Sequence, residues 1–117
     1  MKKREYMDYL NDILDATADV ASFIKGMRYK EFILDRKTLN AVVRSIEIIG
    51  EAAKHIPKSI KNATPDIHWK EIVGMRNKIA HEYFGIDNKI VWDTAKRYLP
   101  RLRKQIDVIV RREIANF

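Results

Sequence analysis

The sequence has no cysteine, only 4 glycines and 3 prolines among 117 residues, and no long apolar run. Without cysteine, disulfides and thiolate metal sites are excluded, which suits a reducing compartment. Few glycines and prolines favour helices over strand-and-turn structure. The basic N-terminus resembles the start of a signal peptide, but Asp8, Asn11, Asp12 and Asp15 interrupt the segment after it. We therefore expect a cytoplasmic protein with no membrane span, folded as one domain over residues 1–117.

Apolar side chains recur at steps of three and four residues over 6–24, which predicts an amphipathic helix ending near residue 26. Residues 27–34 are expected to form a connector or a short helical turn. Asp35 is the predicted N-cap of a second helix, which ends before Pro57. The small residue Gly50 on the apolar face of this helix would let a neighbouring helix approach closely.

The second half of the chain predicts two further helices. Residues 58–65 are polar and are expected to form a loop, and a third helix is expected over about 69–80. A turn at 85–88 would lead into a last helix over about 89–114, kinked or divided by Pro100. Helices of this length with mostly short connections predict an all-α fold, an antiparallel up-and-down bundle of four to five helices.

The formal net charge is +7, and 8 basic against 4 acidic side chains fall in residues 87–117. A basic helical surface is compatible with binding the phosphates of RNA or DNA. It is equally compatible with an ordinary solvated helix face.

Arg76 is the most unusual residue of the third predicted helix. Projected as a helix, residues 69–83 place this arginine within an apolar arc, where an unpaired guanidinium is costly. One explanation is a structural ion pair with Glu47 or Glu51 of the second helix. The other is a cleft in which Arg76 binds an anion such as phosphate, which its planar fork suits.

His81 follows Arg76 by five residues, or about 140° on a continuous helix, so the two side chains would not converge on a straight helix. Either the helix loosens near His81, as Gly85 downstream permits, or the site draws residues from two chains. Tyr83 would return to the side of Arg76. The remaining histidines show no ligand spacing with His81, so no metal site is expected. An imidazole can transfer a proton near neutral pH.

The spacing Arg76-x-x-x-x-His81-x-Tyr83 resembles the signature of the HEPN superfamily, and specifically of its HepT-like toxins. The block 44–52 resembles the family's second-helix block, and the blocks 65–69 and 74–77 resemble the family's approach to the motif. The resemblance covers most of the chain and implies a helical bundle that dimerises, with two motifs across one cleft. Such a homodimer would answer the geometric problem posed by Arg76 and His81.

The resemblance also implies a function: a metal-independent endoribonuclease that needs no cofactor and acts as the toxin of a type II toxin–antitoxin module. Its partners would be RNA and a minimal nucleotidyltransferase antitoxin. Arg76 and His81 would be catalytic, and Asn77 would support the site. Tyr83 would be an active-site residue that the antitoxin modifies with AMP. RNA carries its own nucleophile, the 2′-hydroxyl, so cleavage requires proton transfer and stabilisation of phosphorane charge.

Arg44, Ile48 and Glu51 share one face of the second predicted helix, where an apolar residue stands among polar ones. This face is either a dimer or partner surface or an exposed coincidence of spacing. The alternative function is a non-catalytic helical dimer that docks a nucleotidyltransferase as a substrate-binding subunit. A plain nucleic-acid-binding module is a further alternative, although no helix-turn-helix or aromatic stacking platform is apparent.

Overall fold

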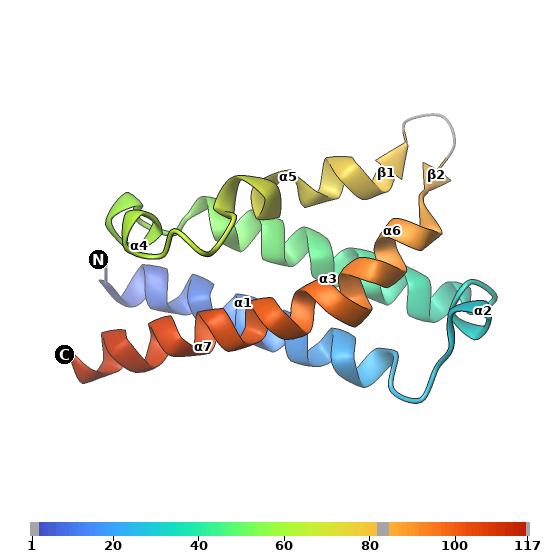
Figure 1. Ribbon diagram of the computed structural model, residues 1–117, viewed down its shortest axis with the longest axis horizontal. Helices are drawn as coiled ribbons and strands as arrows, with labels where there is room; N and C mark the ends of the chain where they lie inside the picture. The colour runs from blue at the N-terminus through green and yellow to red at the C-terminus, as the bar shows by residue number, and fades with distance from the viewer. Residues whose placement is uncertain (1–2, 82–84, 117) are drawn as a thin grey trace.

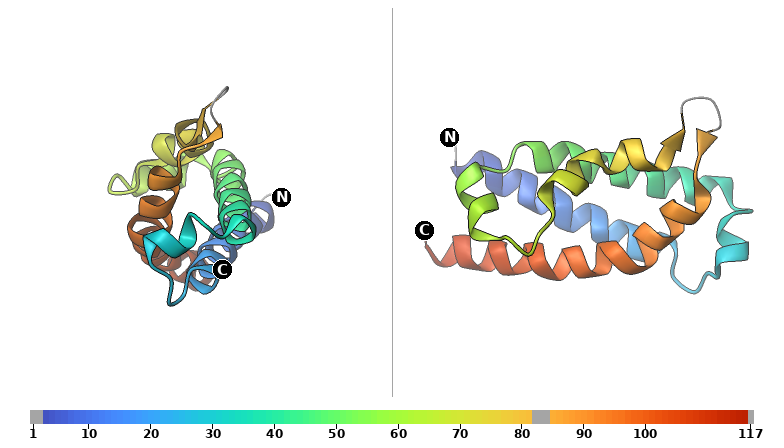
Figure 2. Two further views of the ribbon diagram at one scale, coloured as in Figure 1. Left: turned by 90° about the vertical axis from the view of Figure 1, so that its right-hand side faces the viewer. Right: turned by 45° about the horizontal axis from the view of Figure 1, so that its top comes forward.

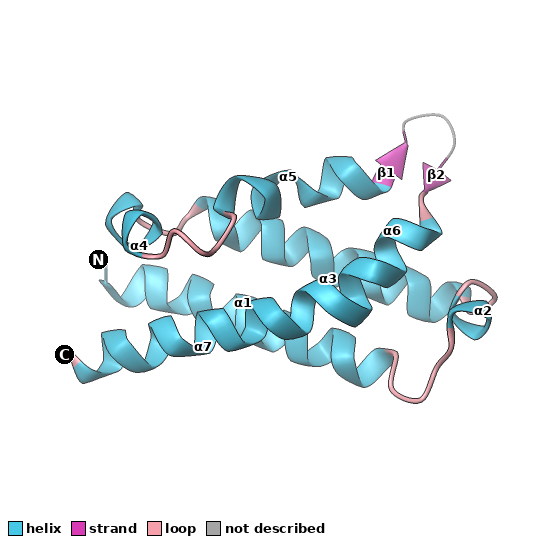
Figure 3. Ribbon diagram, in the orientation of Figure 1, coloured by secondary structure: helices cyan, strands magenta, loops and turns pink. Residues whose placement is uncertain are grey.

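The computed structural model describes residues 3–81 and 85–116, which form a bundle of helices with one two-residue β-pairing at one end (Figures 1 and 3). In chain order the elements are α1 (Lys3–Phe23), α2 (Tyr29–Phe32), α3 (Arg36–Lys54), α4 (Lys58–Ala63), α5 (Trp69–Ile79), β1 (Ala80–His81), β2 (Gly85–Ile86), α6 (Asn88–Asp93), the π-helical turn η1 (Thr94–Tyr98) and α7 (Leu99–Ala115).

The long helices alternate in direction, and both ends of the chain lie at the same end of the bundle (Figure 1). Helix α1 packs on α3 and α7, and α3 packs on α5 (Figure 2). Each long helix contributes a fully or almost fully buried aliphatic side chain to one core, among them Leu10, Ile46, Ile72 and Ile106. The predicted all-α, antiparallel bundle is confirmed. Within the described ranges, no helix has the length and apolar character needed to cross a membrane.

Two local predictions for α3 are confirmed. The carboxylate of Asp35 accepts a hydrogen bond of 3.0 Å from the Thr38 amide, so it caps the helix. A Cβ added at Gly50 would lie 3.3 Å from the carbonyl oxygen of Ile72 and 3.5 Å from that of Val73. Glycine therefore allows the close approach of α5 to α3.

The prediction of a loop over the polar segment 58–65 is wrong, because residues 58–63 form α4. Ile60 is buried and anchors the helix on the core. The hydroxyl of Thr64 then accepts a buried hydrogen bond of 3.0 Å from the Trp69 indole. The burial of Ile60 on the core is a tertiary contact that the polarity of the segment does not reveal. Residues 27–34 were expected to form a connector or a short helical turn. They contain the short helix α2, so the second of these expectations is confirmed.

The last predicted helix is divided, as expected, but the division begins before Pro100. Asp87 caps α6, accepting a hydrogen bond of 3.1 Å from the Ile90 amide. The π-helical turn follows, and the Leu99 amide donates a hydrogen bond to the carbonyl of Thr94, five residues back. Pro100 then falls in the first turn of α7, where its missing N–H is tolerated.

Candidate active site

Helix α5 ends between Arg76 and His81. Its last residue is Ile79, and the chain continues as β1, in which His81 pairs with Gly85 of β2. Gly85 has φ +82°, a left-handed conformation that glycine adopts without strain. The expectation that the helix loosens near His81 is therefore confirmed. The angle of about 140° between Arg76 and His81, which assumes a continuous helix, does not apply. The side chain of His81 and all of Tyr83 lie outside the described residues.

Arg76 projects between Trp69 and Ile72 on α5, as predicted, but its side chain is exposed. Its side chain is 68% accessible, whereas the buried stripe of the helix consists of Trp69, Ile72, Met75 and Ile79. The projected position of Arg76 among these residues therefore stands. The long aliphatic stem lets the guanidinium reach solvent.

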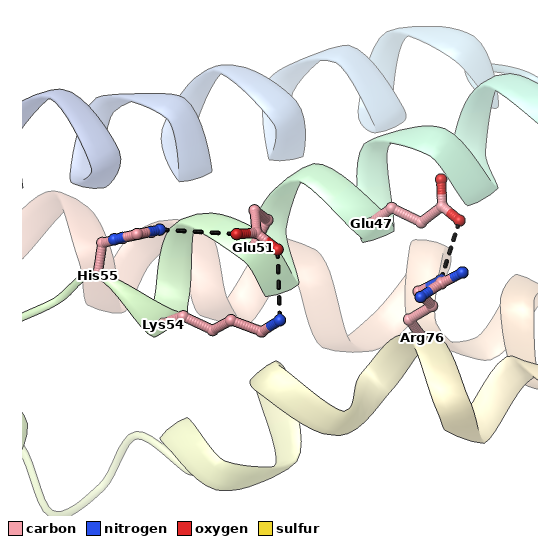
Figure 4. A network of polar contacts seen from close by, with 5 residues as sticks. All are labelled: Glu47, Glu51, Lys54, His55 and Arg76. Carbon is pink, nitrogen blue, oxygen red and sulfur yellow. Dashed lines mark hydrogen bonds and ion pairs between the residues drawn. The ribbon is translucent and has the colours of Figure 1, made fainter.

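The ion pair of Arg76 with Glu47 is confirmed. The Nε atom of the arginine lies 3.3 Å from Oε2 of Glu47, across the space between α5 and α3 (Figure 4). The other carboxylate oxygen, Oε1, lies 3.7 Å from Nη1 of Arg44. Glu47 is 32% accessible and Arg44 is 72% accessible. The partly buried carboxylate of Glu47 thus forms ion pairs with two largely exposed guanidinium groups.

These groups line a groove of about 460 Å³ between α1, α3 and α5. The groove is also lined by Ile48 and Glu51, which the sequence placed on a separate face together with Arg44. The structure therefore brings two groups of predicted residues into one site. The interface role of this face stays a prediction. Asn77, the predicted supporting residue, is exposed on α5 and is not among the residues that line the groove.

An aromatic and an acidic residue from α1, Tyr9 and Asp12, also line the groove, and sequence analysis missed both. The ring of Tyr9 stacks on His55 with centroids 4.3 Å apart and planes 12° from parallel. Glu51 lies 3.6 Å from Nε2 of His55 and 3.3 Å from Nζ of Lys54 (Figure 4). The hydrogen bond and charge of Lys54 lower the pKa of Glu51, with a smaller contribution from His55.

The spacing of Glu51 and His55, four residues apart on one helix, was a signal for this pair. The contact of His55 with Tyr9 had no such signal, because it joins different helices. In the described part of the chain, no three His, Cys, Asp or Glu side chains are grouped so as to hold a metal ion.

The groove combines two guanidinium groups and three carboxylates with an aromatic ring, and Arg76 is its candidate anion-binding group. Arg76 approaches Glu47 through Nε, and it forms no ion pair with any other described residue. A guanidinium in this position can donate two parallel hydrogen bonds to phosphate oxygens. Asp12, Glu47 and Glu51 oppose the approach of an anion, so a phosphate would have to displace or outweigh the Glu47 contact.

Comparisons with known proteins agree on one family. The family model described as "Ribonuclease HepT-like" matches residues 13–109. "Putative RNase MJ1216" of Methanocaldococcus jannaschii is 45% identical over 95% of this chain and 92% of its own length. "Putative RNase MJ0125" of the same organism is 44% identical over 95% of this chain and 96% of its own. "Probable ribonuclease HepT" of Thermococcus cleftensis is 41% identical over 90% of this chain and 96% of its own. No solved structure shows a significant match.

Proposed function

Because the chain belongs to the HepT-like ribonuclease family, we propose that it is an endoribonuclease that cleaves RNA without a metal ion, using Arg76 and His81. The observation that carries this proposal is the position of Arg76. Its guanidinium is 68% accessible at the end of α5, lines a groove and stands within the motif Arg76-x-x-x-x-His81.

In the proposed reaction the 2′-oxygen of the RNA attacks the adjacent phosphorus, and the bond from phosphorus to the 5′-oxygen breaks. The 2′-hydroxyl loses a proton and the leaving 5′-oxygen gains one, which leaves a 2′,3′-cyclic phosphate on the 5′ fragment. His81 transfers a proton, and Arg76 stabilises the negative charge on the pentacoordinate phosphorane. Asn77, next to Arg76 on the last turn of α5, supports the site.

Control of the nuclease is the second part of the proposal. The chain acts as the toxin of a toxin–antitoxin module, and a nucleotidyltransferase antitoxin transfers AMP from ATP to Tyr83. The phenolic oxygen bonds to the α-phosphorus, pyrophosphate leaves, and the phenol gives up its proton. The attached nucleotide adds negative charge and bulk within two residues of His81, where it would exclude an RNA phosphate.

The proposed active form is a homodimer whose interface includes the face of Arg44, Ile48 and Glu51. Ile48 is half-buried beside charged neighbours in the groove, which supports an interface there. Sedimentation at micromolar concentration should give twice the mass of the chain. A monomer that still cleaves RNA would refute the need for a composite site.

The catalytic proposal is tested by RNA cleavage with Arg76→Ala and His81→Ala, each of which should abolish activity with an unchanged helical circular dichroism spectrum. Lys70→Ala and His68→Ala are matched controls, because both residues are exposed on or beside α5 and neither lines the groove. Cleavage should persist in EDTA and should leave a cyclic phosphate. Full activity of His81→Ala, or loss of wild-type activity in EDTA, would overturn the mechanism.

The control proposal is tested by co-expression with a nucleotidyltransferase antitoxin. The intact mass should rise by one or more AMP units that map to the peptide containing Tyr83, and Tyr83→Phe should block the shift. A silenced toxin with no added mass would mean that complex formation alone inhibits it. A purified chain that binds the nucleotidyltransferase but never cleaves RNA would support the alternative of a docking subunit.

A further inference from the structure

A second hollow lies on another side of α5. This cleft, of about 440 Å³, opens between α5 and the successive helical segments α6, η1 and α7, and it shares no lining residue with the groove at Arg76. Helix α5 packs mainly on α3 and only at its end on α6, so it diverges from α7 (Figure 2, right). The space between the diverging helices is lined by side chains of α5 on one side and of α6, η1 and α7 on the other.

Three cations line the cleft: Lys78 from α5, Arg97 from η1 and Arg101 from α7. All are exposed, and none forms an ion pair with another described residue. The two acidic residues of the lining, in contrast, have partners nearby. Glu71 lies 3.6 Å from Nδ1 of His68, and Asp93 lies 3.2 Å from Nζ of Lys89. The contact of Glu71 is an ion pair only when His68 is protonated. The cleft therefore sets three cations without ion pairs in the described chain against Asp93, which is paired with Lys89, and Glu71.

The rest of the lining suits a base or a sugar. Met75 and Ile90 give the cleft an apolar part, and the ring of Tyr98 is half-buried against the core. The Tyr98 hydroxyl makes no hydrogen bond to any described residue. Burial, followed by the charge of Glu71, raises the pKa of Tyr98, although Arg101 acts in the opposite direction. At neutral pH this hydroxyl is a proton donor that is free to bind a ligand.

The π-helical turn supplies part of this lining. Thr94, Arg97 and Tyr98 belong to η1, whose wider turn separates α6 from α7 beside the cleft. Such turns weaken a helix and are frequent at functional sites. Pro100 follows two residues after the end of η1, and it lacks the amide hydrogen that would bond back to this turn.

We propose that this cleft binds a phosphate-bearing nucleotide of an RNA strand, with Lys78, Arg97 and Arg101 on the phosphates and Tyr98 on the base or sugar. Three cations beside an apolar and aromatic surface match the two parts of a nucleotide. The cleft adds a contact for substrate at a distance from the scissile phosphate.

The choice of an RNA strand rests on the proposed function. Lys78 lies between Arg76 and His81 in sequence, in the last turn of α5, so a strand that crosses the end of this helix can reach both hollows. A contact in the cleft would tighten substrate binding and would leave the chemical step unchanged.

The test measures the affinity for a 12-nucleotide RNA analogue with 2′-O-methyl groups by fluorescence anisotropy. The full chain is used as wild type and as variants that carry only the substitutions named below. This probe has no free 2′-hydroxyl, so it stays intact whichever residues perform catalysis. Arg97→Gln combined with Arg101→Gln should weaken binding about tenfold or more. Losing two phosphate contacts should also reduce the slope of log K against log salt by about 1.4.

Arg36→Gln combined with Lys37→Gln is the matched control, because it removes the same charge from exposed residues of α3 that line no described cavity. This control should lose less than half as much affinity on a logarithmic scale. Equal losses in both double variants, or no loss in either, would overturn the proposal. AMP that binds as tightly as the 12-mer through the same arginines would overturn the assignment to a strand.

Failure of this inference is separable from failure of the proposed nuclease. If cleavage by the wild-type chain is abolished by His81→Ala while the cleft variant binds RNA normally, the catalytic site stands and the cleft is refuted. If His81→Ala stays fully active while the cleft variant loses RNA affinity, the cleft stands and the catalytic assignment is refuted.

Discussion

Gly50→Ala should destabilise the protein, although alanine is the better helix former. A methyl group at this position of α3 would lie 3.3 Å from the carbonyl oxygen of Ile72, an atom of the backbone of α5. Backbone cannot rotate away, so α5 must move outward by a few tenths of an ångström. Such overpacking costs about 1–3 kcal/mol. The helical preference of alanine over glycine offsets about 0.5–1 kcal/mol of this cost. We expect a net loss of about 1 kcal/mol.

Gly74→Ala is the matched control. It lies within α5, and a methyl group added there meets no atom within 4 Å. Only the higher helical preference of alanine acts here, so the free energy of unfolding of this variant should rise by about 0.5–1 kcal/mol. The two variants should therefore differ by roughly 2 kcal/mol, which is the cost of the steric contact alone. For a chain of this length, that difference is about 8 °C in Tm.

The assay is urea unfolding followed by circular dichroism at 222 nm, with thermal unfolding as the second measurement. Equal slopes with urea in both variants would show that only stability has changed. If Gly50→Ala proves as stable as Gly74→Ala, the close contact of α3 with α5 is wrong. Arg76 and Glu47 lie on the same two helices, so an outward movement of α5 in Gly50→Ala should also reduce RNA cleavage, whereas Gly74→Ala should not.

Three further outcomes are expected. Glu47→Gln removes the charge that competes with phosphate for the two arginines, so it should raise affinity for the 2′-O-methyl probe up to about fivefold, and weaker binding would contradict this. Thr64→Val leaves the buried Trp69 indole N–H unpaired and should cost about 1–3 kcal/mol in urea unfolding. Burial and the hydrogen bond to Glu113 raise the pKa of Tyr6 to about 12. The stability from that contact should be complete below pH 10 and lost as pH rises toward 12, whereas Tyr6→Phe should lack this dependence.

The candidate site could be predicted in part. Arg76 and His81 stand in a local motif, and the ion pair with Glu47 was one of the two expected explanations for the arginine. The end of α5 before His81 was also foreseen, because Gly85 permits a turn. The ring of Tyr9 against His55 could not be foreseen, since no local pattern indicates which residues of different helices meet.

The long helices and the cap at Asp35 follow from the sequence, because apolar spacing and capping act over a few neighbouring residues. Only packing between distant segments decided the rest. It made a helix of residues 58–63 by burying Ile60, and it left the side chain of Arg76 exposed and paired with Glu47 of α3. It also opened the two hollows beside α5, because their walls come from helices far apart in the chain. Such contacts depend on the relative positions of whole helices, which local sequence does not encode.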